Sequence, residues 1–101
     1  MIVLLGSPPE IQDITINEDP LYVDTKYYVH SIVTDPDNDL AFFQFDASDG
    51  TLSDQNANTI YWTTPATEGD YSIALLVRDS EGNEDLAVVS FFVVEKAKRL
   101  P

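Results

Sequence analysis

The sequence contains no cysteine, one histidine and only five basic residues, and each shortage excludes a class of protein. Without cysteine the chain has no disulfide and no thiolate metal site. The single histidine, His30, cannot build a zinc site alone, and no serine or cysteine motif completes a nucleophilic triad with it. The residues around it alternate in character, which is typical of a position on a surface strand. We therefore expect no catalytic residues and predict that the chain is not an enzyme.

Basic residues are scarce, whereas 18 acidic residues give the chain a formal net charge of −13. Three of the five basic residues, Lys96, Lys98 and Arg99, lie in the last six positions. Binding to nucleic acid or to an anionic membrane surface depends on lysine and arginine, so we expect neither partner, nor direct insertion into a membrane. Such an acidic surface suits cations and basic partners, and it also keeps a protein soluble.

Long hydrophobic runs are absent as well. Residues 1–6 are apolar but far too short to span a membrane or to form a whole signal peptide. They fit the stub of a trimmed signal or lipoprotein leader, residues left by cloning, or a strand of a preceding element. The first alternative predicts an extracellular or cell-surface protein, with or without a lipoprotein anchor. We assign residues 7–95 to one domain and residues 96–101 to a tail or linker.

The composition of the chain is nevertheless globular: 44% of its 101 residues are hydrophobic and 11% are aromatic, enough to bury the core of one domain. No window has a sustained helical period, whereas short runs rich in β-branched and aromatic residues are separated by turn signals about every 8–12 positions. This pattern predicts an all-β, seven-stranded antiparallel sandwich of the immunoglobulin-like type. The predicted strands are residues 10–17, 26–33, 40–46, 51–53, 58–63, 71–79 and 86–94.

Alternation within these strands predicts which side chains face the core. In the third strand, Ala41, Phe43 and Phe45 are assigned inward, which leaves Leu40 and Phe42 on the outer face. The predicted core consists of Val29, Val33, Phe43, Phe45, Ile60, Trp62, Ile73, Leu75, Val77, Val89, Phe91 and Val93.

Two aromatic residues have structural roles in this prediction. Trp62 lies at an inward position, so we expect it to pack in the core rather than to stack on a sugar ring. Tyr71 fits a tyrosine corner, in which the hydroxyl bonds back to the preceding loop. Five further side chains are predicted on the outside, where a patch of them would form a binding surface and scattered ones would have no function. They are Tyr22, Tyr28, Leu40, Phe42 and Tyr61.

Several segments together resemble bacterial and archaeal immunoglobulin-like repeats, in particular polycystic-kidney-disease (PKD) repeats and cadherin-like repeats. The segment SPPEI at 7–11 resembles their proline-rich start, and DPDND at 35–39 resembles their Asp-Pro-Asp-Gly-Asp turn. The segments YWTTP at 61–65, GDYSI at 69–73 and VRDSEG at 77–82 follow in the same order as in those repeats.

The match covers residues 7–94, with two departures. Asn38 replaces the usual glycine, and Phe45 stands where PKD repeats often carry tryptophan. The resemblance implies a non-enzymatic module of secreted or cell-surface proteins, in some cases stabilised by calcium.

Acidic residues concentrate in three segments that an immunoglobulin-like sandwich brings to one end: the start of the domain and the loops after the second and sixth predicted strands. We refer to these segments as the acidic pole. Calcium prefers six to eight oxygen ligands, and the candidate ligands are Asp35, Asp37, Asp39, Asp79, Glu81 and Glu10. The alternative is a solvated turn, in which the same side chains cap backbone amides without a metal. Glu84 and Asp85 complete the pole.

Two functions remain open at this point. One is a structural spacer or adhesion module that contacts neighbouring domains of the same chain, a cell-surface protein or a glycan, with or without stabilisation by calcium at the acidic pole. The other is an accessory module that binds carbohydrate or protein through exposed aromatic side chains on a sheet face.

Overall fold

The computed structural model describes residues 7–96, and within this range the chain forms eight strands and no helix. None of the described residues therefore forms a helix able to cross a membrane. The strands are β1 (Glu10–Thr15), β2 (Leu21–Tyr22), β3 (Lys26–Thr34), β4 (Leu40–Ala47), β5 (Thr51–Leu52), β6 (Thr59–Thr63), β7 (Gly69–Asp79) and β8 (Glu84–Val94).

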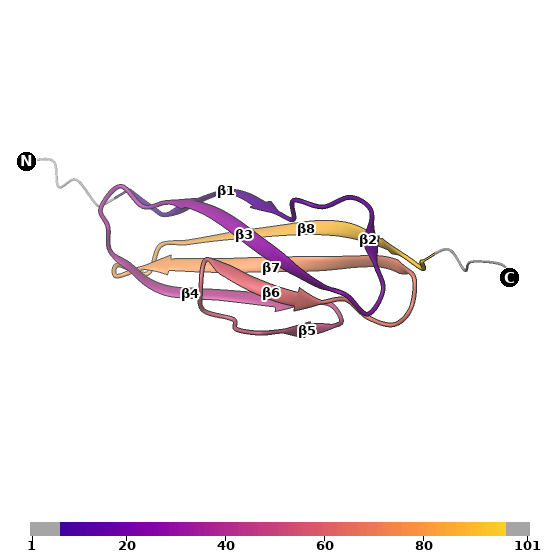
Figure 1. Ribbon diagram of the computed structural model, residues 1–101. Coiled ribbons are helices and arrows are strands. Elements are labelled where there is room, and N and C mark those ends of the chain that lie inside the picture. Colours follow the sequence, from indigo (N-terminus) through magenta and orange to yellow (C-terminus); the bar gives the residue numbers. More distant parts are fainter. Residues whose placement is uncertain (1–6, 97–101) are drawn as a thin grey trace, which may run out of the picture.

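Two four-stranded sheets pack face to face (Figure 1). One has the strand order β1-β3-β6-β5 and the other the order β2-β8-β7-β4. All pairs are antiparallel except β2 with β8, which run parallel. The predicted fold class, an all-β immunoglobulin-like sandwich, is confirmed.

The prediction of seven strands, all antiparallel, is wrong in one detail. The chain leaves the first sheet after β1 and joins the second as β2, where Leu21 pairs with Val93 and Tyr22 with Val94. Two residues are too few to show the alternation of a strand in the sequence, and Pro20 directly before them indicates a turn. The short edge strand expected at 51–53 is present as β5.

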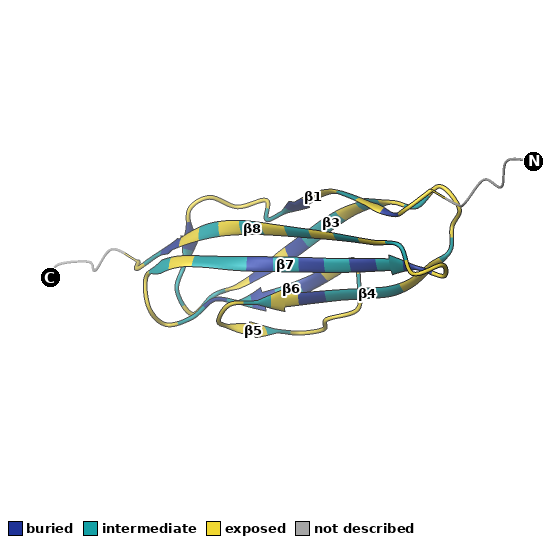
Figure 2. Cartoon of the chain, turned by 180° about the vertical axis from the view of Figure 1, so that it is seen from behind, coloured by how far each residue is buried: buried dark blue, intermediate teal, exposed yellow. Residues whose placement is uncertain are grey.

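The core lies between the sheets and is visible as a buried stripe along β3, β6 and β7 (Figure 2). Along β7, Ile73, Leu75 and Val77 are buried and alternate with more accessible residues, as expected for a strand with one inward face. Eight of the twelve predicted core residues are buried, and Val33, Phe43, Val89 and Phe91 pack against them while partly buried. Three residues of the buried hydrophobic core were not predicted: Ile14, Leu21 and Tyr27.

The inward assignment of Ala41 is wrong, because this residue is exposed. The pairing of β4 with β7 shifts between Leu40 and Phe42, so that Ala41 has no partner in the register. A bulge of this kind turns the side chain out of the alternation that the next residues follow. From Phe43 onward the predicted alternation holds, and Phe45 is fully buried.

Trp62 and Tyr71 have the predicted structural positions. Trp62 is fully buried, and its Nε1 donates a hydrogen bond of 2.9 Å to the Asp49 carbonyl. The Tyr71 hydroxyl donates to the Thr67 carbonyl in the loop before β7, which is the geometry of a tyrosine corner. Gly50, with φ of +83°, allows the β4–β5 turn to pass directly over the Trp62 indole.

β4 is the edge strand of its sheet, and the segment between β5 and β6 covers its free side. The Phe45 amide donates to the Gln55 carbonyl at 2.7 Å, and the Gln55 side chain returns a bond to the Phe45 carbonyl. The Asn56 side chain donates to the Phe43 carbonyl at 2.7 Å. These bonds occupy backbone groups that would otherwise offer a template to a strand of another chain.

The described chain begins at one end of the sandwich and finishes at the other (Figure 1). β1 starts beside the turns that follow β3 and β7, and β8 ends at the opposite side of the molecule. A domain with this topology separates whatever precedes it from whatever follows it.

Candidate functional site

The three segments of the acidic pole meet in the structure as predicted. The Ser80 amide donates to the Asp39 carbonyl at 2.9 Å, and the Ser80 hydroxyl donates to Asp39 Oδ2 at 2.6 Å. The start of β1 is tied to the same end, because the Ile11 amide donates to Asp85 Oδ2 at 2.8 Å. These contacts join the loop after β3, the turn after β7 and the start of the domain.

Asp79 organises the turn between β7 and β8. Its carboxylate, in a residue only 2% exposed, accepts hydrogen bonds from the Glu81 amide, the Asn83 amide and the Asn83 side chain at 2.8–2.9 Å. Burial alone would raise the pKa of this carboxyl. The bonds from the Asn83 side chain and from the amides of Asn83, Glu81 and Gly82 outweigh burial, so the pKa lies below its ordinary value. A cation at Asp79 would share its oxygens with these donors.

Asp35 and Asp39 carry the two buried polar side-chain atoms that have no hydrogen-bond partner among the described residues. Asp35 Oδ2 accepts from the Leu40 amide at 2.8 Å, and Asp39 Oδ2 accepts from Ser80. The other oxygen of each carboxylate, Oδ1, is buried and has no hydrogen-bond partner. A buried carboxylate oxygen without a partner is unfavourable, and a bound cation is one way to compensate it.

The remaining predicted ligands are less constrained. Glu10, Asp37 and Glu81 are exposed side chains. Glu84, which belongs to the pole but is not a predicted ligand, forms an ion pair with Arg78 on the neighbouring strand. Among residues 7–96, no three acidic or histidine side chains lie together in an arrangement that could hold a metal ion. Of the six predicted ligands, Asp35 and Asp39 are the two that carry a buried oxygen without a hydrogen-bond partner.

Sequence reasoning missed the roles of Ser80 and Asn83. Ser80 links two acidic loops, and Asn83 supplies two of the three bonds that hold the Asp79 carboxylate. The sequence did contain a signal for the role of Asn83, since an aspartate followed by glycine and asparagine is typical of a side-chain-capped turn. The sequence contained no signal for the role of Ser80, because Asp39 and Ser80 lie 41 residues apart.

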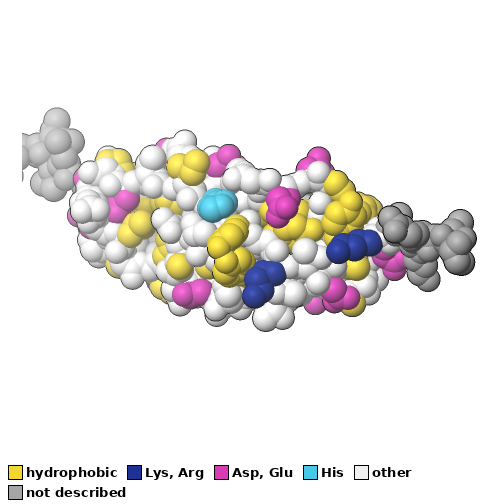
Figure 3. Space-filling view, viewed as in Figure 1, with side chains coloured by type: hydrophobic (Ala, Val, Ile, Leu, Met, Phe, Trp, Pro, Cys, Tyr) yellow, Lys and Arg dark blue, Asp and Glu magenta, His cyan; other side chains and the backbone are white. Residues whose placement is uncertain are grey.

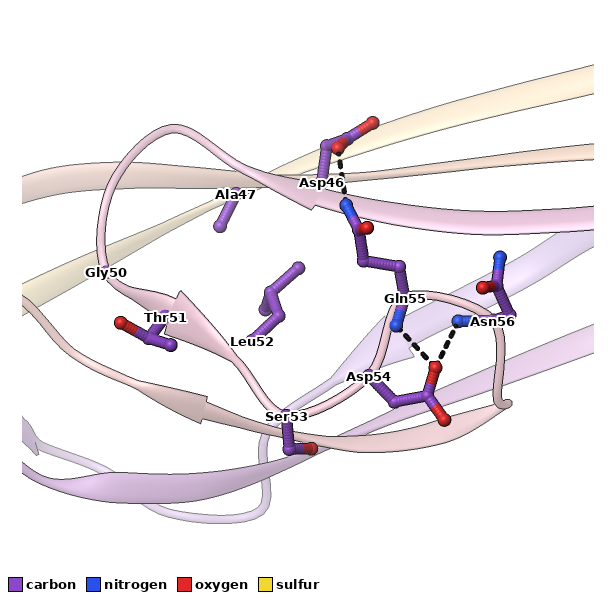
Figure 4. Close-up of a pocket in the computed structure, with 9 residues that line it drawn as sticks. All are labelled: Asp46, Ala47, Gly50, Thr51, Leu52, Ser53, Asp54, Gln55 and Asn56. Atoms are coloured by element: carbon purple, nitrogen blue, oxygen red, sulfur yellow. Dashed lines mark hydrogen bonds between the residues drawn. The ribbon is translucent and has the colours of Figure 1, made fainter.

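A hollow of about 500 Å³ lies between β4 and β5 (Figure 4). Its polar side chains serve the fold: Gln55 bonds to Asp46, and Asp54 Oδ1 caps the amides of Gln55 and Asn56. Leu52 is its main apolar residue, and no histidine, lysine or arginine lines it. The two carboxylates that line the hollow, Asp46 and Asp54, are thus engaged in hydrogen bonds to neighbouring residues.

The outer face of the β3–β6 sheet carries a stack of aromatic side chains. Tyr28 and Tyr61 stand opposite each other with ring centroids 4.1 Å apart, and the Tyr61 hydroxyl donates to the Tyr28 hydroxyl. His30 stacks on Tyr28 at 6.0 Å, and Lys26 Nζ lies 5.1 Å from the Tyr61 ring centre. Figure 3 shows the histidine (cyan) beside hydrophobic side chains on this face. These contacts hold Tyr28, Tyr61, His30 and Lys26 together on the sheet face, where Tyr28 remains exposed.

The predicted exposed residues divide into two groups. Tyr28 is 51% exposed and Leu40 is 39% exposed, whereas Tyr22, Tyr61 and Phe42 are half-buried. The outer face of β8 adds three strongly exposed apolar residues that were not predicted (Figure 2). They are Leu86, Val88 and Phe92.

Comparisons with known proteins support the fold. No family model and no curated protein sequence matches this chain. Among solved structures, the PKD1 domain of Vibrio anguillarum Epp superposes with a TM-score of 0.70 at 18% identity, over 91% of this chain and 100% of that domain. The PKD1 domain of the Vibrio cholerae metalloprotease PrtV gives a TM-score of 0.66 at 19% identity, over 87% of this chain and 99% of that domain.

This chain has the immunoglobulin-like β-sandwich fold of PKD domains. The predicted resemblance to PKD repeats is therefore confirmed for the fold. A third match is to a structure of carbohydrate-binding modules from the β-sandwich superfamily, with a TM-score of 0.76 at 19% identity. It covers 91% of this chain and only 36% of that one, so the present chain corresponds to about a third of the larger protein.

Proposed function

We propose that this PKD-like domain is a non-catalytic spacer and interaction module of a secreted or cell-surface protein. The observation that carries the proposal is the placement of the start of β1 and the end of β8 at opposite ends of a two-sheet sandwich. β7, with 11 residues, extends about 37 Å at the usual rise per residue. Neighbouring domains of the same protein, or a surface protein or glycan, are the expected partners.

The absence of cysteine allows a direct test of the spacer role. Ser7→Cys and Lys96→Cys introduce one label at each end of the described chain, and both positions are exposed. Pulsed electron–electron double resonance between the two spin labels should give one narrow distance distribution. A broad distribution would show that the sandwich does not hold its ends apart, and would refute the spacer role.

Calcium binding at the acidic pole is the second part of the proposal. Asp35 and Asp39 would hold the ion through the Oδ1 atoms that have no other partner, with exposed Asp37 and water completing the oxygen ligands. The ion would neutralise neighbouring carboxylates and fix the loop after β3 against the turn after β7. We expect affinity in the millimolar range, as for extracellular modules generally.

Thermal unfolding in chelator and in a calcium series tests this part. Magnesium at equal ionic strength controls for charge screening, and Asp70→Asn, at an exposed position at the start of β7, is the matched control variant. A calcium-selective rise of the midpoint that disappears in Asp35→Asn and Asp39→Asn supports the site. An equal response to both ions, or none, refutes it and leaves the spacer role unaffected.

A second candidate function is carbohydrate or protein binding on a sheet face. It is favoured by the exposed side chains of Tyr28 and Phe92, and by the similarity of fold to carbohydrate-binding modules. Co-sedimentation with insoluble polysaccharides tests the carbohydrate alternative. Binding that is lost in Tyr28→Ala or Phe92→Ala, but kept in a variant of an exposed polar residue such as Ser90→Ala, would support it. No retention on any polysaccharide would rule against it.

A further inference from the structure

Tyr28 and Tyr61 form a pair that the spacer role does not use. They are directly opposed on β3 and β6, their ring centroids are 4.1 Å apart with an angle of 32° between the planes, and their hydroxyl groups share a hydrogen bond. Tyr28 is 51% exposed, so a diffusible oxidant reaches it. We propose that this pair is an oxidative cross-linking site, at which a peroxidase acting with hydrogen peroxide joins the two rings into a dityrosine.

The reaction balances with one molecule of hydrogen peroxide. Each phenol loses one electron and its hydroxyl proton, which gives two phenoxyl radicals. These couple through the ring carbons next to the hydroxyl groups, so that one carbon–carbon bond forms. The hydrogen atom on each coupled carbon then moves to the oxygen by way of solvent, and two phenols are restored. The chain loses two hydrogen atoms in total, and the peroxide is reduced to two molecules of water.

The geometry favours coupling within this pair over coupling between molecules. Two reactants held side by side react as if at very high concentration, and here the strand register holds them before oxidation begins. Neither partner is locked in the core, so the rings can slide from their stacked position to the bonding distance. The hydrogen bond between the two hydroxyls, followed by burial and the charge of Tyr28, raises the pKa of Tyr61 above its ordinary value. The Tyr61 phenol is therefore protonated at pH 7 and gives up its proton together with an electron.

The other tyrosines lack such a partner among the described residues. Tyr27 is buried and its hydroxyl accepts a bond from the Tyr22 amide. Tyr71 packs against Trp62, and its hydroxyl is bonded to the loop before β7. Tyr22 is half-buried at the far end of the sandwich, with Lys96 over its ring. Because of these positions, coupling is expected at the Tyr28–Tyr61 pair and not at the other tyrosines.

Coupling would tie β3 to β6 across 33 positions of the sequence, in a chain that has no cysteine for a disulfide. A covalent tie of this span restricts the unfolded chain much as a disulfide does. The expected effect is a rise of the unfolding midpoint of about 10 °C. The inference does not depend on the spacer role or on calcium binding.

The test treats the purified chain at low concentration with a haem peroxidase and limiting hydrogen peroxide. We expect a monomeric product lighter by two hydrogen atoms, with blue dityrosine fluorescence and a cross-linked peptide that contains Tyr28 and Tyr61. Tyr28→Phe and Tyr61→Phe should each abolish this product, whereas Tyr22→Phe should retain it. Because the phenylalanine variants remove only a hydroxyl, circular dichroism and the midpoint of the untreated variants report whether they fold.

Three results would overturn the inference. The first is a product formed only between molecules, the second is a cross-link that maps to other tyrosines, and the third is undiminished monomeric cross-linking in both Tyr28→Phe and Tyr61→Phe. If the cross-linked monomer forms but its unfolding midpoint is unchanged, the cross-linking site is supported and the expected stabilisation is refuted.

Discussion

Replacing Asp79 by alanine removes the acceptor of three hydrogen bonds inside the turn that joins β7 to β8. In the folded domain the carboxylate is 2% exposed, and it holds the Glu81 amide, the Asn83 amide and the Asn83 side chain at 2.8–2.9 Å. Hydrogen bonds to a charged group contribute about 1.5–3 kcal/mol each. The full sum is not expected, since Glu81 is exposed and its amide can bond to water in the variant.

The expected loss for Asp79→Ala is therefore about 3 kcal/mol of unfolding free energy, which corresponds to about 12–24 °C in the midpoint for a domain of this size. Urea unfolding followed by tryptophan fluorescence measures it, because Trp62 is the only tryptophan and is fully buried. Asp70→Ala removes an exposed carboxylate from the other end of β7 and should change stability by less than about 0.5 kcal/mol. A loss below about 1 kcal/mol for Asp79→Ala would refute the assignment of this carboxylate as the organiser of the turn.

The same carboxylate predicts a dependence on pH with a definite sign. Its folded-state pKa lies below the ordinary value of 3.8, because hydrogen bonds from Asn83 and neighbouring amides outweigh the effect of burial. Its contribution is therefore fully present above pH 3.8 and is lost as the pH falls through the folded-state pKa. In chelator, the unfolding free energy of the parent domain should fall more steeply below about pH 4 than that of Asp79→Asn. Parallel curves for the two proteins would contradict this account.

Four further variants test the rest of the fold. Gly50→Ala should destabilise the domain by about 3 kcal/mol, since the new methyl group meets a backbone carbonyl and the buried indole at positive φ. Gly82→Ala, also at positive φ but in open space, should cost only about 1 kcal/mol by the same urea assay. The double variant Gln55→Ala/Asn56→Ala uncovers the edge of β4, and light scattering on mild heating should show earlier aggregation than in the parent domain. Tyr71→Phe should lower the midpoint by about 4–8 °C through loss of one hydrogen bond to the loop before β7.

Most of the fold could be predicted because its strands are long enough to show a period of two. The alternation around Phe43 and Phe45, and around Ile73 and Leu75, identified inward positions that are buried or pack against the core in the structure. The failures are local. Ala41 lies in a bulge, and a bulge leaves no mark on composition. β2 is two residues long, and its pairing with β8 depends on the path of the whole chain.

The candidate site could be predicted only at the level of segments. Because the topology of an immunoglobulin-like sandwich fixes which loops share an end, the acidic segments were expected together, and contacts such as Ser80 to Asp39 join them. Which oxygen atoms are free depends on local hydrogen bonds instead. Asp79 and Asp35 look alike in the sequence, yet the first has its carboxylate held by three donors while the second keeps a buried oxygen without a partner.

The placement of the start of β1 and the end of β8 at opposite ends also determines how the domain responds to a stretching force. β2 lies parallel to β8 near the far end, where the Val23 amide donates to the Val94 carbonyl at 3.0 Å beyond the two paired residues. Tension applied through the ends draws β1 and β2 one way along their axes and β8 the other way. The hydrogen bonds between these strands are then sheared together instead of being opened one after another, as in the unzipping of a hairpin. The placement of the start of β1 and the end of β8 that supports the proposed spacer role thus also sets the resistance of the sandwich to stretching.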